Sequence, residues 1–409
     1  MRKIIAAILI TAVCLGACSC TAATGTDNST ITATDATTAA ATSETSKESI
    51  ETSSAETTAA YCDSGLLKGL KIEKNNFFVT EDEDCEKLLR WVTASAKEKN
   101  YDGSVLIATD DGIILYGGPN AKTTTGDPVD PYTVYEIGSV TKTFTAVEIM
   151  KLIEQGKLSL NDKLTDFFPK FKNGKNITIA NLLNMQSGIP DYVNDSMTFF
   201  KLENINDFEK YYSNDGLSDE EFLDYLYKNK LLFEPGTEVS YSNTNYHLLA
   251  LIIEKIEGIS YSEAIKRDIF DPLGMEHSSA TAYGDETSIP DEFAGGYHTF
   301  QNGSRGAGDI HSCMADLLIF DRALFGGRLV SEDSLKIMMD FKKGEYGCAL
   351  FPYGEHAYGH SGSVTSYVTQ NVVIETESRG KIYFIASTST VRGPACIDEM
   401  LHKAIGALE

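Results

Sequence analysis

The stretch GSVTK at residues 138–142 decides the fold that we expect for this chain. Its two polar ends, Ser139 and Lys142, are three positions apart, so a helix would place both side chains on one face. Apolar residues recur at near-helical spacing after the lysine, and a glycine follows where helices commonly end. The pattern predicts a helix over residues 141–155, with Ser139 at its first turn.

A serine at the first turn of a helix lies beside backbone N–H groups that have no partner in the helix and beside the positive end of the helix dipole. A lysine one turn later can take or relay the hydroxyl proton when its surroundings disfavour the ammonium form. This arrangement activates a serine nucleophile for acyl transfer. The same spacing also arises when a serine caps a helix and the lysine is a surface charge, so the pair alone is not specific.

A second motif is the sequence YSN, which contains Tyr241 and Asn243. A tyrosine near a lysine can act as a general base toward the serine and as an acid toward the leaving group. The asparagine amide can hold a substrate amide or orient the lysine. Taken alone, the motif is also typical of an ordinary turn.

A third motif is the sequence HSG, which contains His360 and Gly362, just ahead of a strand predicted from Val364. A glycine at this position lets a substrate approach the strand edge. The backbone N–H of Ser363 could pair with that of Ser139 as an oxyanion hole. Alone, a histidine before a turn glycine is an ordinary surface feature.

Together and in this order, the motifs resemble the S-x-x-K, Y-x-N and K/H-x-G motifs of the serine β-lactamase/penicillin-binding-protein superfamily. The similarity covers about Tyr101 to the C-terminus and is greatest to the branch of class C β-lactamases, D-alanyl-D-alanine carboxypeptidases and S-x-x-K esterases. Further matching runs are LLNMQSGIPDY at 182–192, DPLGM at 271–275 and GDIHS at 308–312.

The resemblance implies a role for each motif residue. Ser139 would form the acyl-enzyme, Lys142 would assist its deprotonation, and Tyr241 would act as acid and base. Asn243 would bind the acylamide of the substrate. The remaining implied positions are His360 and Gly362 at the border of the substrate channel, and Ser363 with Ser139 as oxyanion donors.

The expected fold class is α/β (α+β). Strand-like runs lie near both ends of the chain, at 104–108, 113–116, 364–375 and 381–387. Helical patterns include 82–99, 219–228, 261–269 and about 395–408. This order predicts one sheet built from N- and C-terminal pieces and interrupted by helices. The resemblance implies a β-lactamase/transpeptidase-like architecture, with an antiparallel sheet flanked by helices and an inserted all-helical subdomain over about 157–290. The active site would lie between the sheet and this subdomain.

The N-terminus has the pattern of an export signal. Two basic residues precede an apolar run that is too short to span a bilayer, and the run ends in small residues before Cys18. This resembles the lipobox of bacterial lipoproteins, with an ordinary signal peptide as the alternative. We expect a signal peptide over 1–17, lipid on Cys18 and an extracytoplasmic protein anchored to the cell membrane.

Residues 18–62 are rich in Ser, Thr and Ala and have too few large apolar residues to form a core, so they predict a flexible stalk. A hydrolase domain over 63–409 would follow. After Cys18, six cysteines remain, and the sequence leaves open both a Cys62–Cys85 bridge and free buried thiols. These six are Cys20, Cys62, Cys85, Cys313, Cys348 and Cys396.

The net charge of −24 opposes binding to nucleic acid, which requires a cationic surface. No group of Cys and His has zinc spacing, so no metal and no cofactor is expected. The expected partners are a peptidoglycan peptide or a small amide or ester, and the membrane through the N-terminal lipid.

Two departures from the family pattern bear on the substrate. Class C β-lactamases have Lys where His360 stands, and a histidine is mostly neutral at pH 7, which points away from an efficient β-lactamase. Other cations that could hold a carboxylate are Lys342, Lys343 and Arg305. Met185 stands where the family more usually has His, and Gln186 where it has Thr.

The leading hypothesis is therefore a D-alanyl-D-alanine carboxypeptidase-like serine hydrolase. A β-lactamase or a carboxylesterase of the same fold is an alternative. A penicillin-binding sensor that keeps the fold without turnover is a further alternative from a different class.

Overall fold

The computed structural model describes residues 77–79, 83–99, 101, 103–118, 121–123, 127–202, 218–280, 304–364, 368–388 and 393–408. The chain divides into two units, Met1–Ala60 and Tyr61–Glu409, and every described residue belongs to the second. The predicted signal peptide, Cys18 and the stalk lie outside the described residues. Within the described part of the chain, no helix is both long and apolar enough to cross a membrane.

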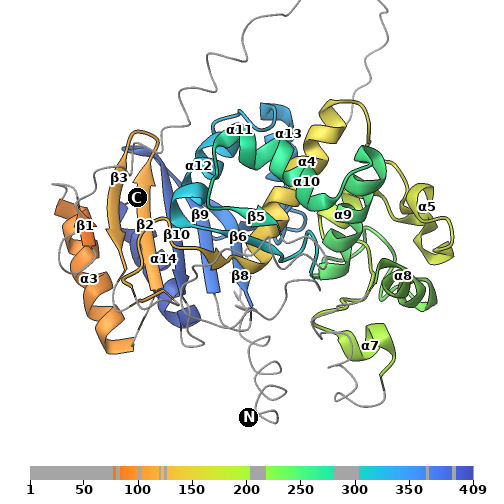
Figure 1. The fold of residues 1–409 in the computed structure, drawn as a ribbon, viewed down its shortest axis with the longest axis horizontal. Helices are drawn as coiled ribbons and strands as arrows, with labels where there is room; N and C mark the ends of the chain where they lie inside the picture. Colours follow the sequence, from red (N-terminus) through yellow and green to blue (C-terminus); the bar gives the residue numbers. More distant parts are fainter. Residues whose placement is uncertain are drawn as a thin grey trace, which may run out of the picture. The chain divides into compact units, whose positions relative to one another are not determined.

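A seven-stranded antiparallel sheet forms the centre of the domain, in the order β1-β3-β2-β10-β9-β8-β7 (Figure 1). The N-terminal strand β2 pairs with the C-terminal strand β10. The sheet is therefore built from the two ends of the domain, as the sequence predicts. The strands are β1 (Phe77–Val79), β2 (Gly103–Thr109), β3 (Ile113–Gly117), β7 (Phe351–Pro352), β8 (Ala357–Ser363), β9 (Val368–Thr376) and β10 (Gly380–Thr388).

The central strands are buried on both faces, which explains why they are apolar nearly throughout. Successive side chains of a strand point to opposite faces. In β2, Val105 and Ile107 belong to one hydrophobic core, and Leu106 and Ala108 belong to the other. The sheet thus separates two cores.

The smaller core lies under two helices from the ends of the domain, α3 (Glu83–Lys99) and α14 (Gly393–Leu408), which pack on each other and on the sheet. Both helices match the predicted ranges closely. The larger core lies on the opposite face. It includes residues of α4 (Thr141–Glu154), α9 (Asn243–Glu257) and α12 (Met314–Phe325).

The part of the chain between the sheet halves is mostly helical. Figure 1 shows α5, α7 and α8 on the side of α9 that is away from the large sheet. The remaining helical elements are α5 (Leu164–Phe167), η3 (Lys172–Asn176), α6 (Ile179–Leu183), α7 (Ser196–Phe200), α8 (Asp219–Lys228), α10 (Tyr261–Ile265), η5 (Lys266–Phe270), α11 (Asp271–Leu273) and α13 (Glu332–Met338).

A second, three-stranded sheet in the order β4-β6-β5 lies next to the predicted nucleophile. Its strands are β4 (Tyr135–Glu136), β5 (Ser279–Ala280) and β6 (Ile310–Ser312). The backbone N–H of Ile137, just after β4, donates to Ile310 O at 3.1 Å. The small sheet thereby fixes the chain immediately before Ser139.

Two local expectations were wrong in detail. The HSG motif lies inside strand β8 and not ahead of a strand, because residues 357–363 pair with β9 along their whole length. The helix predicted over 261–269 is divided into α10 and a π-helical turn, η5, before Asp271. The first difference bears on the site, because it makes the third motif part of a rigid strand.

Candidate active site

Ser139 lies in the short 3₁₀ helix η2 (Gly138–Val140), and Lys142 lies in the first turn of α4, which follows directly. Gly138 has φ +53°, a conformation that favours glycine. The hydroxyl of Thr141 accepts from the N–H of Ile310 at 3.0 Å, which ties the start of α4 to the small sheet. The distance from Lys142 Nζ to Ser139 Oγ is 3.0 Å, so the predicted pair is in contact.

The Lys142 amine is fully buried and contacts three oxygens. Besides Ser139 Oγ, it donates to Asn243 Oδ1 at 2.7 Å and to Ala307 O at 2.6 Å. Amide oxygens only accept, so these two bonds consume two N–H groups. A neutral amine then directs its lone pair at the Ser139 hydroxyl, which is the orientation that a general base needs.

Burial lowers the pKa of the Lys142 ammonium to about 7, against the opposing charges of Asp191 and Asp309. The rings of Tyr241 and Tyr246 lie 4.9 Å and 5.8 Å from Nζ and help to exclude water. At neutral pH, a substantial fraction of Lys142 is therefore the free amine.

Tyr241 borders Ser139 from the chain just before α9. Burial raises the pKa of its hydroxyl, and a hydrogen bond with Ser139 opposes the increase. The phenol is therefore protonated at neutral pH, when Lys142 is partly neutral. This division favours Lys142 as the base and Tyr241 as the group that carries a proton toward a leaving group.

Asn243 is the first residue of α9, and both ends of its amide have partners within the protein. Oδ1 accepts from Lys142, and Nδ2 donates to Asp191 Oδ2 at 2.9 Å. Of the two roles that the sequence left open, this arrangement matches orientation of the lysine. Binding of a substrate amide by Asn243 stays a prediction.

The edge of β8 lies against η2 through Gly362. A Cβ atom at Gly362 would lie 1.8 Å from Ile137 O and 3.0 Å from Ser139 N, so only glycine permits this approach. A Cβ atom at Gly138 would in turn lie 3.0 Å from Ser363 N. The backbone amides of Ser139 and Ser363 therefore belong to two segments in direct contact, as an oxyanion hole requires.

His360 is 2% exposed and lies among Tyr241, Tyr346 and Phe351. Its Nε2 is 3.1 Å from the hydroxyl of Tyr346. Burial, together with the charge of Lys142, lowers the pKa of His360 to about 3. The ring is neutral at physiological pH and provides no cation for a substrate carboxylate.

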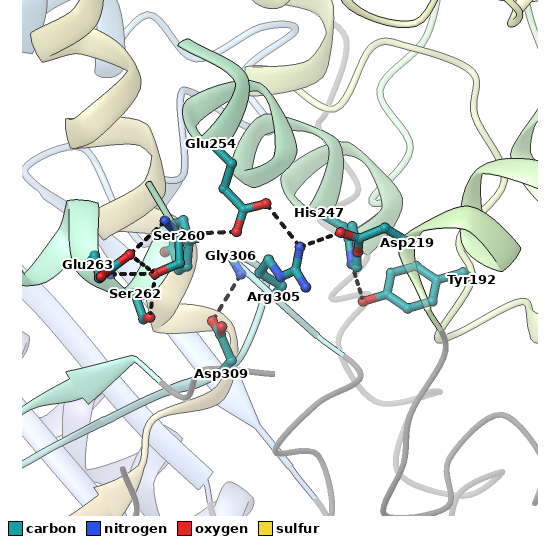
Figure 2. Close-up of polar contacts among 11 residues, drawn as sticks. Tyr192, Asp219, His247, Glu254, Ser260, Ser262, Glu263, Arg305, Gly306 and Asp309 are labelled. Carbon is teal, nitrogen blue, oxygen red and sulfur yellow. Dashed lines mark hydrogen bonds and ion pairs between the residues drawn. The ribbon is translucent and has the colours of Figure 1, made fainter. Parts of the chain in front are cut away.

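The three other cations considered for a carboxylate each contact another group. Arg305 Nη1 pairs with Asp219 at 3.0 Å and Glu254 at 3.1 Å (Figure 2). The two lysines, Lys342 and Lys343, contact Asp340 and the carbonyl of Thr237, respectively.

Sequence reasoning missed three contributors to the site. Ala307 acts through its carbonyl, which no side-chain pattern reveals. Asp191 lies within the matching run at 182–192, but the sequence assigned it no role. Met185, the departure from the family pattern, accepts through its sulfur from the N–H of Ser242 at 3.3 Å and from Asn245 Nδ2 at 3.6 Å. Its thioether thus holds the chain on either side of Asn243.

The model of the family described as Beta-lactamase matches residues 88–402. The chain belongs to this family. Membership places it among the serine hydrolases of the β-lactamase/penicillin-binding-protein superfamily.

Three similar proteins illustrate the relationship. Penicillin-binding protein 4* of Bacillus subtilis (strain 168) is 34% identical over 272 residues, which are 61% of this chain and 58% of that protein. The octameric penicillin-binding protein homologue from Pyrococcus abyssi is 27% identical with a TM-score of 0.64, over 80% of this chain and 78% of that one. D-amino acid amidase from Ochrobactrum anthropi SV3, complexed with L-phenylalanine, has a TM-score of 0.65 at 22% identity, over 80% and 98% of the chains.

Proposed function

We propose that this protein is an extracytoplasmic serine hydrolase that acts through an acyl-enzyme on D-alanyl peptides or related amides and esters. The observation that carries the proposal is the position of Lys142 Nζ. It lies 3.0 Å from Ser139 Oγ, while two pure acceptors hold its other N–H groups. This geometry supports activation of Ser139 by a neutral lysine.

The reaction begins when the neutral Lys142 amine takes the Ser139 proton as Oγ attacks the carbonyl carbon of the substrate. The N–H groups of Ser139 and Ser363 stabilise the oxyanion. Tyr241 then gives its proton to the departing amine or alcohol and receives the proton that Lys142 took, which leaves the acyl group on Ser139 and Lys142 neutral again. Water attacks this ester by the same route in reverse, and the acid and Ser139 are released.

An amide or peptide substrate is supported by the named activities of similar proteins, which include penicillin-binding proteins and a D-amino acid amidase. The neutral, buried His360 supports a substrate class other than β-lactams, because efficient capture of a β-lactam carboxylate favours a fixed cation. The signal-like N-terminus and Cys18 support an anchored location from which cell-wall peptides are within reach.

The direct test is acylation of the purified protein by a fluorescent penicillin, with Ser139→Ala as the control. We expect a labelled wild type and an unlabelled variant, and equal labelling of both would remove Ser139 as the nucleophile. Turnover of a D-alanyl-D-alanine peptide, a D-amino acid amide, a short-chain ester and a chromogenic cephalosporin then identifies the substrate class. Acylation without turnover of any of these would favour a penicillin-binding sensor.

The location has a separate test. Cys18→Ser should release the protein from the membrane fraction and abolish incorporation of labelled fatty acid. If the variant stays in the membrane fraction, the anchor is not at Cys18.

A further inference from the structure

A buried carboxylate, Asp191, lies behind the lysine and asparagine of the site and has no part in the reaction described above. The residue is 5% exposed. Its neighbours are held against the first turns of α9, because Tyr192 N donates to Thr244 Oγ1 at 3.0 Å and that hydroxyl donates to Pro190 O at 2.7 Å. Asp191 is therefore fixed relative to Asn243.

Every hydrogen bond to the Asp191 carboxylate in the described structure comes from an N–H group. Oδ1 accepts from Val193 N at 2.8 Å and Oδ2 from Asn194 Nδ2 at 2.7 Å, while Asn243 Nδ2 lies 3.2 Å and 2.9 Å from the two oxygens. An ionised carboxylate accepts through both oxygens, whereas a protonated one would turn an O–H toward one of these donors. Burial raises the pKa of the Asp191 carboxyl, and the hydrogen bonds from Val193, Asn194 and Asn243 oppose the increase. With donors on both oxygens and no acceptor for an O–H among these partners, the arrangement fits the anion.

This anion decides how the Asn243 amide is turned. The two ends of an amide are similar in shape, and their orientation follows from the hydrogen bonds around them. The NH₂ end must face Asp191, so Oδ1 faces Lys142, where it accepts at 2.7 Å. With the amide reversed, an NH₂ group would face the Lys142 amine, and the lone pair of Lys142 would no longer be directed at Ser139.

We propose that Asp191 is a positioning residue that turns the Asn243 amide, and through it the Lys142 amine, into the orientation that activates Ser139. The inference rests on the proposed function, and it assigns a role to a residue that touches neither the substrate nor Ser139.

Asp191 also affects the charge of the site. Its negative charge favours the ammonium form of Lys142, and burial of the lysine opposes it. The other titratable and charged groups around Lys142 are Tyr241 before α9, Tyr246 on α9, Asp309 in the turn before β6 with Arg305 at the start of that turn, and His360 on β8. Removing the Asp191 charge leaves these groups in place, so it should lower the pKa of Lys142.

The test is Asp191→Asn in the full-length protein, with the rate of acylation by penicillin and the turnover of the best substrate measured across pH. We expect kcat to fall about 10- to 100-fold, the effect of leaving one buried donor without its acceptor, with little change in KM. We also expect the acid limb of the profile to move about one unit toward lower pH, because a less stable ammonium loses its proton earlier. A merely structural aspartate would not move that limb.

Two further variants keep the test decisive. Asp191→Asn combined with Asn194→Asp exchanges two side chains that are 2.7 Å apart, so it keeps the total charge and moves the anion away from Asn243. If the single variant does not fold, this exchange carries the test, and the same shift of the acid limb is expected. Asn194→Ala is the matched control, since it removes an exposed donor to the same carboxylate, and it should leave the limb in place.

The possible results distinguish a failure of the proposed function from a failure of the role assigned to Asp191. If the wild type is neither acylated nor active, the proposed function fails. If the wild type is active and the Asp191 variants keep both its kcat and its acid limb, the proposed function stands and the role of Asp191 is overturned.

Discussion

Lys142 and Arg305 are two largely buried basic residues that differ in the charge of the groups their side chains contact. The described contacts of the Lys142 amine are all with uncharged oxygens, at 2.6 to 3.0 Å. Arg305 contacts two carboxylates, Asp219 and Glu254, at 3.0 and 3.1 Å. Burial lowers the pKa of Lys142 to about 7. Burial also acts to lower the pKa of Arg305, but the carboxylates outweigh it and raise that pKa.

Because both side chains are buried, the comparison indicates that the groups in contact with a buried basic side chain determine whether it keeps its proton. A buried amine whose hydrogen-bond partners are all neutral becomes a base, because the cost of burying its charge outweighs the attraction of Asp191 and Asp309. A guanidinium that meets two carboxylates keeps its charge and holds elements together. In Figure 2, Arg305 joins α8 and α9 to the turn that also contains Gly306 and Asp309.

The two regions are connected through that turn. Arg305 is two residues before Ala307, whose carbonyl accepts from Lys142. Between them, Gly306 O accepts from Thr145 Oγ1 of α4 at 2.7 Å, and a Cβ atom at Gly306 would lie 2.6 Å from the Cβ of Ala250 on α9. Arg305 thus supports the placement of one acceptor of the Lys142 amine.

The largest effect should come from removing the ability of Lys142 to lose its proton. Lys142→Arg keeps a positive charge but places a guanidinium that stays protonated at the site. We expect acylation to slow by about 10³-fold, within the range for loss of a general base. Single-turnover kinetics with a fluorescent penicillin would measure this. Arg305→Lys keeps its charge and should slow acylation less than about threefold. Equal losses of acylation rate in Lys142→Arg and Arg305→Lys would contradict the different roles assigned to the two side chains.

The next effect should come from Tyr241→Phe, which removes the phenol that carries a proton to the leaving group. We expect kcat for an amide substrate to fall about 10²-fold. An ester with a good leaving group should lose less, because it needs little protonation. Tyr358→Phe removes a phenol that donates to Glu375 on the same sheet, and it should keep wild-type kinetics.

The pH dependence of the acylation rate of the wild type tests whether Lys142 is the general base. Lys142 must be neutral to accept the Ser139 proton, and its pKa is about 7. The acylation rate should therefore rise about tenfold per pH unit below pH 7 and level off above it. His360 has a pKa of about 3 and does not titrate in this window. A rate independent of pH between 5 and 7 would contradict Lys142 as the base.

The smallest effect should come from Arg305→Gln, which loosens the turn that holds Ala307 without touching the reacting atoms. We expect kcat to fall about three- to tenfold and the free energy of unfolding to fall by about 1–2 kcal/mol. Arg267→Gln is the matched control, because Arg267 also meets two carboxylates but lies on the surface. It should change stability by less than about 0.5 kcal/mol and leave kcat unchanged. Identical kinetics in the two variants would show that Arg305 does not influence the site.

The sequence by itself determined the architecture. Helices over 83–99, 141–154 and 219–228 and strands β2, β3 and β10 lie where periodicity and turn residues place them, because these patterns depend on neighbours along the chain. It also predicted the contact between Ser139 and Lys142, since a spacing of three on a helix brings the two side chains together. The family resemblance identified Tyr241 and Asn243 as members of the site.

Only the tertiary structure determined which groups contact those residues. The Ala307 carbonyl reaches Lys142 from 165 positions away, and Asp191 reaches Asn243 across 52 positions. The placement of His360 inside β8 depended on its pairing with β9, which residues 360–363 do not reveal by themselves. The Ser–Lys pair follows from one turn of helix, but the low pKa of its lysine follows from burial among neutral acceptors that only the folded chain brings together.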